Sequence, residues 1–152
     1  MKPFKYRGLT PQQIETKCKQ VYLTTYVREA DGSPVLIYSH DGKRVIFTEH
    51  HFYHAFSFED KRNLGMRKFS YQRARLVLWI KEIVTGNQRA IFKDTLKLHK
   101  GLRILFRRLY YDKKNKYLVV LKYKKNKDLE FLTHYLVKNK IYEQDLLKDL
   151  GK

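Results

Sequence analysis

Apolar and polar residues follow a helical period near the start of the chain. Thr10 can serve as a helix N-cap, Pro11 fits the first helical position, and Gln13 completes a capping box. These residues predict a helix over about residues 10–21. The single cysteine, Cys18, falls within it, so the chain can form no internal disulfide.

The next apolar runs are short and rich in β-forming residues. Residues 35–38 and 44–48 flank the dipeptide Asp41-Gly42, which is a strong turn signal. This pattern predicts a β-hairpin. The segment 49–66 holds four aromatic residues and three histidines and shows no clear period.

A longer helical pattern covers residues 70–85. Val77, Ile80 and Val84 lie on one face at helical spacing, and Gly86-Asn87 supplies a stop signal. The spacing predicts a central helix over these residues.

The last third of the chain changes to β-type runs. Residues 103–111, 116–123 and 129–137 are separated by short polar turns, which predicts an antiparallel meander. A final helix is expected over residues 141–150. The predicted fold class is α+β, with an N-terminal helix and hairpin, a central helix and a C-terminal antiparallel β-meander. The 152 residues are expected to form a single domain with its core at about 35–137.

The chain is strongly basic, and its charge is unevenly distributed. It holds 33 Lys+Arg against 15 Asp+Glu, a formal net charge of +18. Eleven of the basic residues and a single acid lie between residues 100 and 127. Lysines at sheet edges also prevent unwanted strand pairing, which accounts for one or two of them. Because neutralised phosphates release counterions, the expected partner is RNA or DNA. The residues expected to bind it are Arg75, Arg107, Arg108, Lys113, Lys114, Lys116, Lys122 and Lys124.

Most enzyme signatures are absent from the sequence. It contains no phosphate loop, no GxGxxG and no GxSxG, and its acids are too scattered for a two-metal nuclease. We therefore expect no cofactor. The sequence has no apolar run that suits a secretory signal or a membrane span, so we expect a cytoplasmic protein without a membrane partner.

Histidines offer one candidate for chemistry. His50 and His54 are four residues apart and would share a helical face, but a zinc site needs a further ligand, and no HExxH arrangement is present. We therefore expect no metal. The two alternatives are one catalytic histidine and histidines that only pack or donate hydrogen bonds.

A ribonuclease that works without a metal needs few groups. It requires proton transfer to and from the reacting oxygens, and cations or hydroxyls around the phosphate. Arg73 lies at the edge of the apolar face of the central helix, where it could point into a cleft. On the last strand, alternation puts Thr133 and Tyr135 on one face and His134 on the other. One of these two faces is then functional and the other structural.

Three segments together resemble a known superfamily. The segments 52–56 (FYHAF), 73–80 (RAR followed by WI) and 130–135 (EFLTHY) resemble the small metal-independent ribonucleases, which group barnase, EndoU-type, colicin-type and RelE-like domains. The resemblance implies RNA cleavage through a 2′,3′-cyclic phosphate. It makes His54 an acid or base, Arg73 a phosphate clamp, and Thr133 and Tyr135 contacts to the scissile phosphate. His134 departs from the pattern, because a small residue is expected between them.

The resemblance also implies partners. Many members are toxins of phages or mobile elements that act on tRNA, mRNA or the ribosome, and an acidic antitoxin or immunity protein restrains them. A chain of charge +18 suits such a partner. Three functions stay open: a metal-independent endoribonuclease, a non-catalytic RNA- or DNA-binding module, and an interaction protein whose basic face meets an acidic protein.

Overall fold

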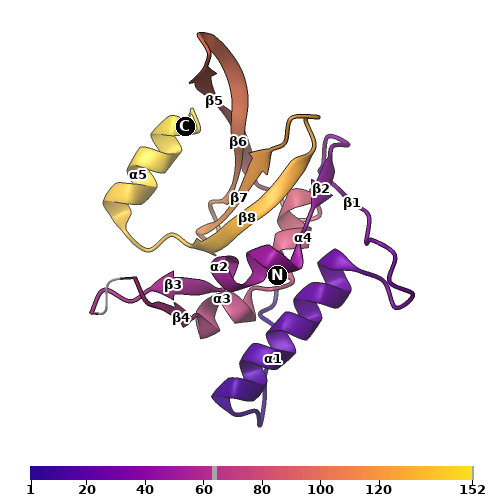
Figure 1. Cartoon of the computed structure of the whole chain (residues 1–152). Helices are drawn as coiled ribbons and strands as arrows, with labels where there is room; N and C mark the ends of the chain where they lie inside the picture. The colour runs from indigo at the N-terminus through magenta and orange to yellow at the C-terminus, as the bar shows by residue number, and fades with distance from the viewer. Residues whose placement is uncertain (63–64, 152) are drawn as a thin grey trace.

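Helices gather around a curved sheet in the computed structural model, which describes residues 1–62 and 65–151 (Figure 1). The helices are α1 (Pro11–Tyr22), α2 (Phe52–Ala55), α3 (Tyr71–Arg75), α4 (Trp79–Val84) and α5 (Lys140–Asp149), with a π-helical turn η1 (Leu23–Val27) and a 3-10 turn η2 (Glu49–His51). None of the described helices is long and apolar enough to cross a membrane.

The strands form one large sheet and one small hairpin. They are β1 (Ile37–Tyr38), β2 (Arg44–Ile46), β3 (Ser57–Glu59), β4 (Arg67–Phe69), β5 (Ile91–His99), β6 (Leu102–Asp112), β7 (Tyr117–Tyr123) and β8 (Leu129–Leu136). The large sheet has the order β1-β2-β8-β7-β6-β5, and β3 pairs only with β4. The pairing of β2 with β8 is parallel, and the other pairings are antiparallel. The fold is therefore α+β, as the sequence predicts.

The local signals at both ends of the chain are confirmed. The Thr10 hydroxyl accepts from the Gln13 backbone N–H at 3.3 Å, and the Gln13 side chain accepts from the Thr10 N–H at 2.9 Å. The hairpin around Asp41-Gly42 is present as β1 and β2. The meander of β6, β7 and β8 and the final helix α5 are also present.

The predicted central helix is present, but it is divided. Residues 70–85 form α3 and α4, with a break after Arg75. Leu76 and Val77 are adjacent and both buried, at 4% and 0% exposure, and Trp79 and Ile80 are buried as well. One straight helix would turn part of this run toward solvent, so the burial of neighbouring apolar residues outweighs an unbroken helical ladder. The sequence reading also missed β5 and the β3–β4 hairpin.

The sheet has two faces with separate cores. The inner face carries Tyr117, Val119 and Leu121. These side chains belong to the main hydrophobic core, which also includes buried residues of α1 and α4. The outer face carries Leu118 and Val120, which pack under α5. Buried residues of α1 and α5 extend this core on both sides of the predicted range 35–137.

Gly86, the predicted stop, follows α4 and packs closely against His40 of the β1–β2 turn. It has φ +83°, and a Cβ atom there would lie 3.0 Å from His40 Cβ. Gly86→Ala should lower the free energy of unfolding by about 2 kcal/mol, because both the backbone conformation and the contact become unfavourable. Urea denaturation measures this. Gly101, with φ +79° and no atom within 4 Å, is the matched control. Equal losses in Gly86→Ala and Gly101→Ala would show that the His40 contact is unimportant.

Candidate functional site

Arg73 lies where α2, α3 and β8 meet. Ser70 caps α3 by accepting from the Arg73 backbone N–H at 3.1 Å, which fixes the start of the helix. The Arg73 guanidinium donates to Ser57 O at 2.7 Å and to Ala55 O at 3.3 Å. Its Nη1 also lies 3.5 Å from the Thr133 hydroxyl oxygen. These contacts hold a half-buried cation at the edge of β8.

Thr133 and Tyr135 share the outer face of β8, as the alternation predicts. They pair with Val120 and Leu118, whose side chains lie under α5. The Tyr135 ring lies 5.4 Å from the Arg73 guanidinium carbon, a distance that allows a cation–π contact. The Tyr135 hydroxyl is 2.9 Å from the hydroxyl of Tyr142 on α5. The structure thus brings Arg73, Thr133 and Tyr135 together.

His54 is exposed at the end of α2, directly before the carbonyls that Arg73 contacts. Partial burial lowers the pKa of the His54 imidazole, and the charges of Arg67, Arg73 and His51 lower it further. These effects favour the neutral imidazole, which can accept a proton. We call His54, Arg67, Arg73, Thr133 and Tyr135 the Arg73 cluster.

Arg67 is a member that sequence reasoning missed. It lies on β4, and its side chain donates to the Ser57 hydroxyl at 2.8 Å and to the carbonyls of Ser57 and His54 at 3.0 and 3.2 Å. Two guanidinium groups therefore converge on one turn. Burial lowers the pKa of Arg73, and the neighbouring Arg67 lowers it further. The place is strongly electropositive and suits an anion.

His134 is buried on the inner face of the sheet, which does not fit its prediction as a catalytic residue. Its side chain faces inward with 0% exposure, and its Nδ1 lies 2.7 Å from the Tyr117 hydroxyl. The Phe56 ring packs edge-on against it with a centroid distance of 4.6 Å. Burial lowers the pKa of His134 well below its ordinary value, with a further contribution from Arg73. Of the two faces of β8, the one that carries Thr133 and Tyr135 is therefore the face that a substrate could reach.

Arg108 is also not available to nucleic acid, and its prediction as a phosphate contact is wrong. Its side chain is 1% exposed and lies between two carboxylates. Its Nε donates to Asp94 at 2.7 Å, and its Nη1 and Nη2 donate to Asp41 at 2.7 and 2.9 Å. The Tyr110 and Tyr123 hydroxyls accept from it at 3.1 and 3.0 Å. This arginine joins the β1–β2 turn to β5.

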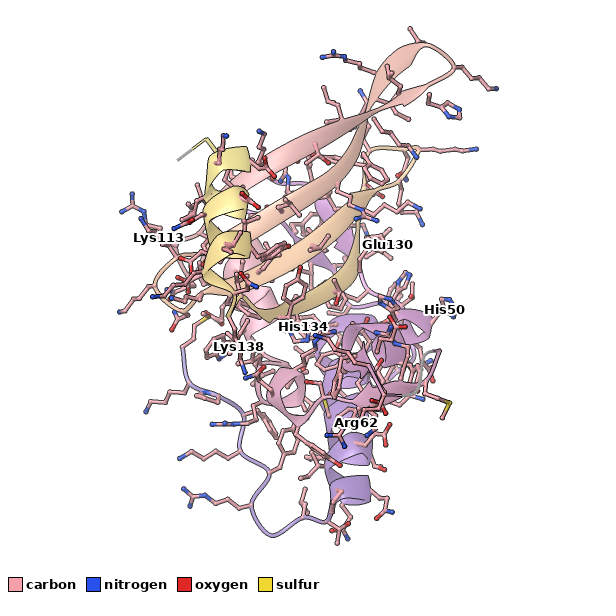
Figure 2. The ribbon with its side chains drawn as sticks, turned by 90° about the vertical axis from the view of Figure 1, so that its left-hand side faces the viewer. His50, Arg62, Lys113, Glu130, His134 and Lys138 are labelled. Carbon is pink, nitrogen blue, oxygen red and sulfur yellow. The ribbon has the colours of Figure 1, made fainter. Side chains whose placement is uncertain are left out.

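The other predicted phosphate-binding residues do not form one patch. Lys113, Lys114 and Lys116 lie at the β6–β7 turn, whereas Lys122 and Lys124 lie near the β7–β8 turn at the opposite end of the strands. Figure 2 shows Lys113 and Glu130 on opposite sides of the view, with α5 between them. Lys116 pairs with Glu143 of α5 at 3.5 Å.

The two arginines at 75 and 107 also lie apart. Arg75 contributes to a hollow with the N-terminal segment, where its carbonyl accepts from the Phe4 N–H at 2.7 Å. Arg107 is exposed and pairs with Lys122 on the outer face. Of the predicted residues, Arg107, Lys122 and Lys124 share an end of the sheet.

A cavity of about 1090 Å³ is lined mainly by α1 and by residues 28–30, with Phe52 and Tyr53 of α2 at its side. None of the five members of the Arg73 cluster lines it. Within residues 1–62 and 65–151, no group of three or more His, Cys, Asp or Glu side chains is placed to hold a metal ion.

No family model, no curated protein and no solved structure matches this chain. The resemblance to metal-independent ribonucleases therefore depends on the three segments described above, and the activity that it implies enters as a proposal.

Proposed function

We propose that this protein binds RNA over the Arg73 cluster and cleaves it as an endoribonuclease that leaves 2′,3′-cyclic phosphate ends. One observation carries the proposal. Arg73 is half-buried beside the Thr133 hydroxyl, yet it takes no part in the ion pairs formed among the described residues. The carbonyls of Ala55 and Ser57 that accept from Arg73 carry no net charge, so an anion would stabilise this guanidinium further. A phosphate is the anion that a guanidinium fork fits best.

The cluster supplies groups for one transesterification. Arg73 and the Thr133 hydroxyl donate to the phosphate oxygens, whose charge grows in the transition state. Neutral His54 accepts the proton of the 2′-hydroxyl as its oxygen attacks phosphorus. The bond from phosphorus to the 5′-oxygen then breaks, and that oxygen takes a proton from water. The hydroxide left behind takes back the proton held by His54.

A binding-only function has one observation in its favour. Cleavage requires two proton transfers. Among the described members of the Arg73 cluster, only His54 is of a residue type that ordinarily titrates near neutral pH. The role of a toxin restrained by an acidic antitoxin remains a prediction from the resemblance.

Replacing His54 distinguishes these two functions. His54→Gln should lower the cleavage rate about 100-fold and leave RNA affinity unchanged, because it removes a proton acceptor and no cation. Wild-type activity should fall as the pH drops through the lowered pKa of His54, since the protonated ring cannot accept a proton. This acidic limb should be missing in the variant. Cleavage of labelled RNA in EDTA, measured across pH, gives both results.

The matched control is His50→Gln, at an exposed histidine of η2, which should cleave at the wild-type rate. If the wild type binds RNA but leaves it intact in EDTA, the endoribonuclease proposal is wrong and the binding-only function replaces it. Equal rates for His54→Gln and wild type would remove His54 from the mechanism.

A further inference from the structure

A second hollow lies on the outer face of the sheet, beyond the part under α5. It has a volume of about 460 Å³, within the range of small-ligand sites. We name it the Phe106 hollow, and its lining residues are Lys97, His99, Ile104, Leu105, Phe106, Lys122, Tyr123, Lys124, Lys125 and Glu130. Four lysines against one carboxylate make this lining cationic.

The register of the sheet gathers these cations. Lys122 pairs with Arg107 on β6 and with Glu130 on β8. Directly opposed residues of antiparallel strands point to the same face, so Arg107 adds its charge beside the hollow. Glu130 lies 3.8 Å from Lys124 and offsets that lysine. The remaining cations are available to phosphate.

Phe106 supplies a half-buried aromatic ring among these charges. The Lys97 Nζ and the Arg107 guanidinium carbon each lie 4.7 Å from its ring centroid. A nucleotide matches this arrangement, because its base can stack on an aromatic ring while its phosphate meets the cations. An acidic protein segment would also pair with these cations, but it has no base to stack on the Phe106 ring.

The Phe106 hollow lies next to the Arg73 cluster along β8. Glu130 lines the hollow, and Thr133 follows about 10 Å further along the strand. Burial lowers the pKa of His51; the charge of Glu130 opposes this, and the charges of His50, Lys122 and Lys124 lower the pKa further. His51 in turn contributes to the lowered pKa of His54, after burial, Arg67 and Arg73. Because Glu130 and Thr133 lie on the same strand, an extended RNA strand can reach both places.

We infer that the Phe106 hollow is a second subsite for the same RNA strand, with a base on Phe106 and its phosphate at Lys122 and Arg107. The inference rests on the proposed function for the nature of the strand. It adds a binding site away from the scissile phosphate and explains why cations gather at this end of the sheet.

Binding of a 2′-O-methyl RNA tests this subsite, because that strand has no 2′-hydroxyl to react. The probe is a labelled single strand of about 12 nucleotides, within the site sizes of single-strand-binding folds. Fluorescence anisotropy gives its dissociation constant over a series of salt concentrations. The variants are Phe106→Leu and the pair Lys122→Gln with Arg107→Gln. The pair Lys113→Gln with Lys114→Gln makes the same charge change at the opposite end of the sheet.

Each variant has its own expected result. The Lys122 and Arg107 pair should reduce the slope of log affinity against log salt by about 2, because two phosphate contacts are lost. Phe106→Leu should weaken binding about tenfold at an unchanged slope, since stacking does not release counterions. Phe106→Trp keeps a stacking ring and should keep the affinity, which separates stacking from a folding defect. The Lys113 and Lys114 pair should bind like wild type.

Other outcomes overturn the subsite. Wild-type binding by Phe106→Leu, or an equal loss of slope in the Lys113 and Lys114 pair, would contradict it. Equal binding of poly-glutamate of the same charge, also unaffected by Phe106→Leu, would show a site for an acidic protein instead. The proposed function fails separately. Reduced affinity in these variants with no cleavage of ordinary RNA by wild type would keep the subsite and reject the enzyme.

Discussion

Arg73→Ala should lower the rate of RNA cleavage about 100- to 1000-fold, the usual effect of removing one donor to transition-state charge. Arg75→Ala should leave the rate unchanged. The two arginines belong to the same short helix and carry the same charge, but only Arg73 reaches Thr133 and Tyr135. The comparison therefore separates a specific phosphate contact from general attraction by a basic protein.

A conservative variant sharpens this prediction. Arg73→Lys keeps the charge but loses the planar fork, so an intermediate rate is expected. Because Arg73 also donates to Ala55 O and Ser57 O, the unfolding midpoint of each variant must be measured beside the rate. A folded Arg73→Ala that cleaves as fast as Arg75→Ala would contradict the role of this guanidinium.

Arg108→Met should lower the free energy of unfolding by about 3 to 5 kcal/mol, a large share of the stability of a domain of this size. The loss arises because Asp41 and Asp94 stay close together without the cation that neutralises both. Arg107→Met removes the neighbouring exposed guanidinium and should change stability by less than about 0.5 kcal/mol. Urea denaturation at pH 7 measures both.

The same network predicts a dependence on pH. Hydrogen bonds from the Arg108 guanidinium hold the pKa of Asp41 well below its usual range. This stabilisation is fully present above the ordinary aspartate pKa of about 3.9 and is lost as the pH falls through the lower folded-state value. Wild type should therefore lose stability in acid, and Arg108→Met should lose less over the same window. A parallel acid loss in both proteins would show that Arg108 does not control this titration.

The strands of the meander could be predicted because burial leaves a pattern in the sequence. A strand buried on both faces, such as β7, is a continuous apolar run, and a strand buried on one face alternates. The division of Thr133 and Tyr135 from His134 survives even though a bulge shifts the register between Val120 and Leu121. The alternation of side chains along a strand also applies to Arg108, which lies two residues before Tyr110 and therefore on the same face of β6. Counting charges without applying alternation led to the wrong prediction for this residue.

The meeting of Arg73 with Thr133 could not be derived from the sequence, because 60 residues separate them. The helical spacing that placed Arg73 at a cleft does not hold, since α3 ends at Arg75, Val77 lies in the break, and Ile80 and Val84 belong to α4. Arg67 was missed because it lies on a hairpin without an obvious turn signal. Contacts between distant segments depend on packing, and local patterns do not specify them.

The chemical nature of the product ends tests the central proposal most directly. A short RNA is incubated with the protein in EDTA beside the same RNA with a single 2′-deoxy nucleotide at the cut position, and the products are identified by mass spectrometry. We expect a 2′,3′-cyclic phosphate from the first strand and no cleavage at that position in the second. Cleavage of the 2′-deoxy strand at the same position, or no cleavage of either strand, would contradict the proposal.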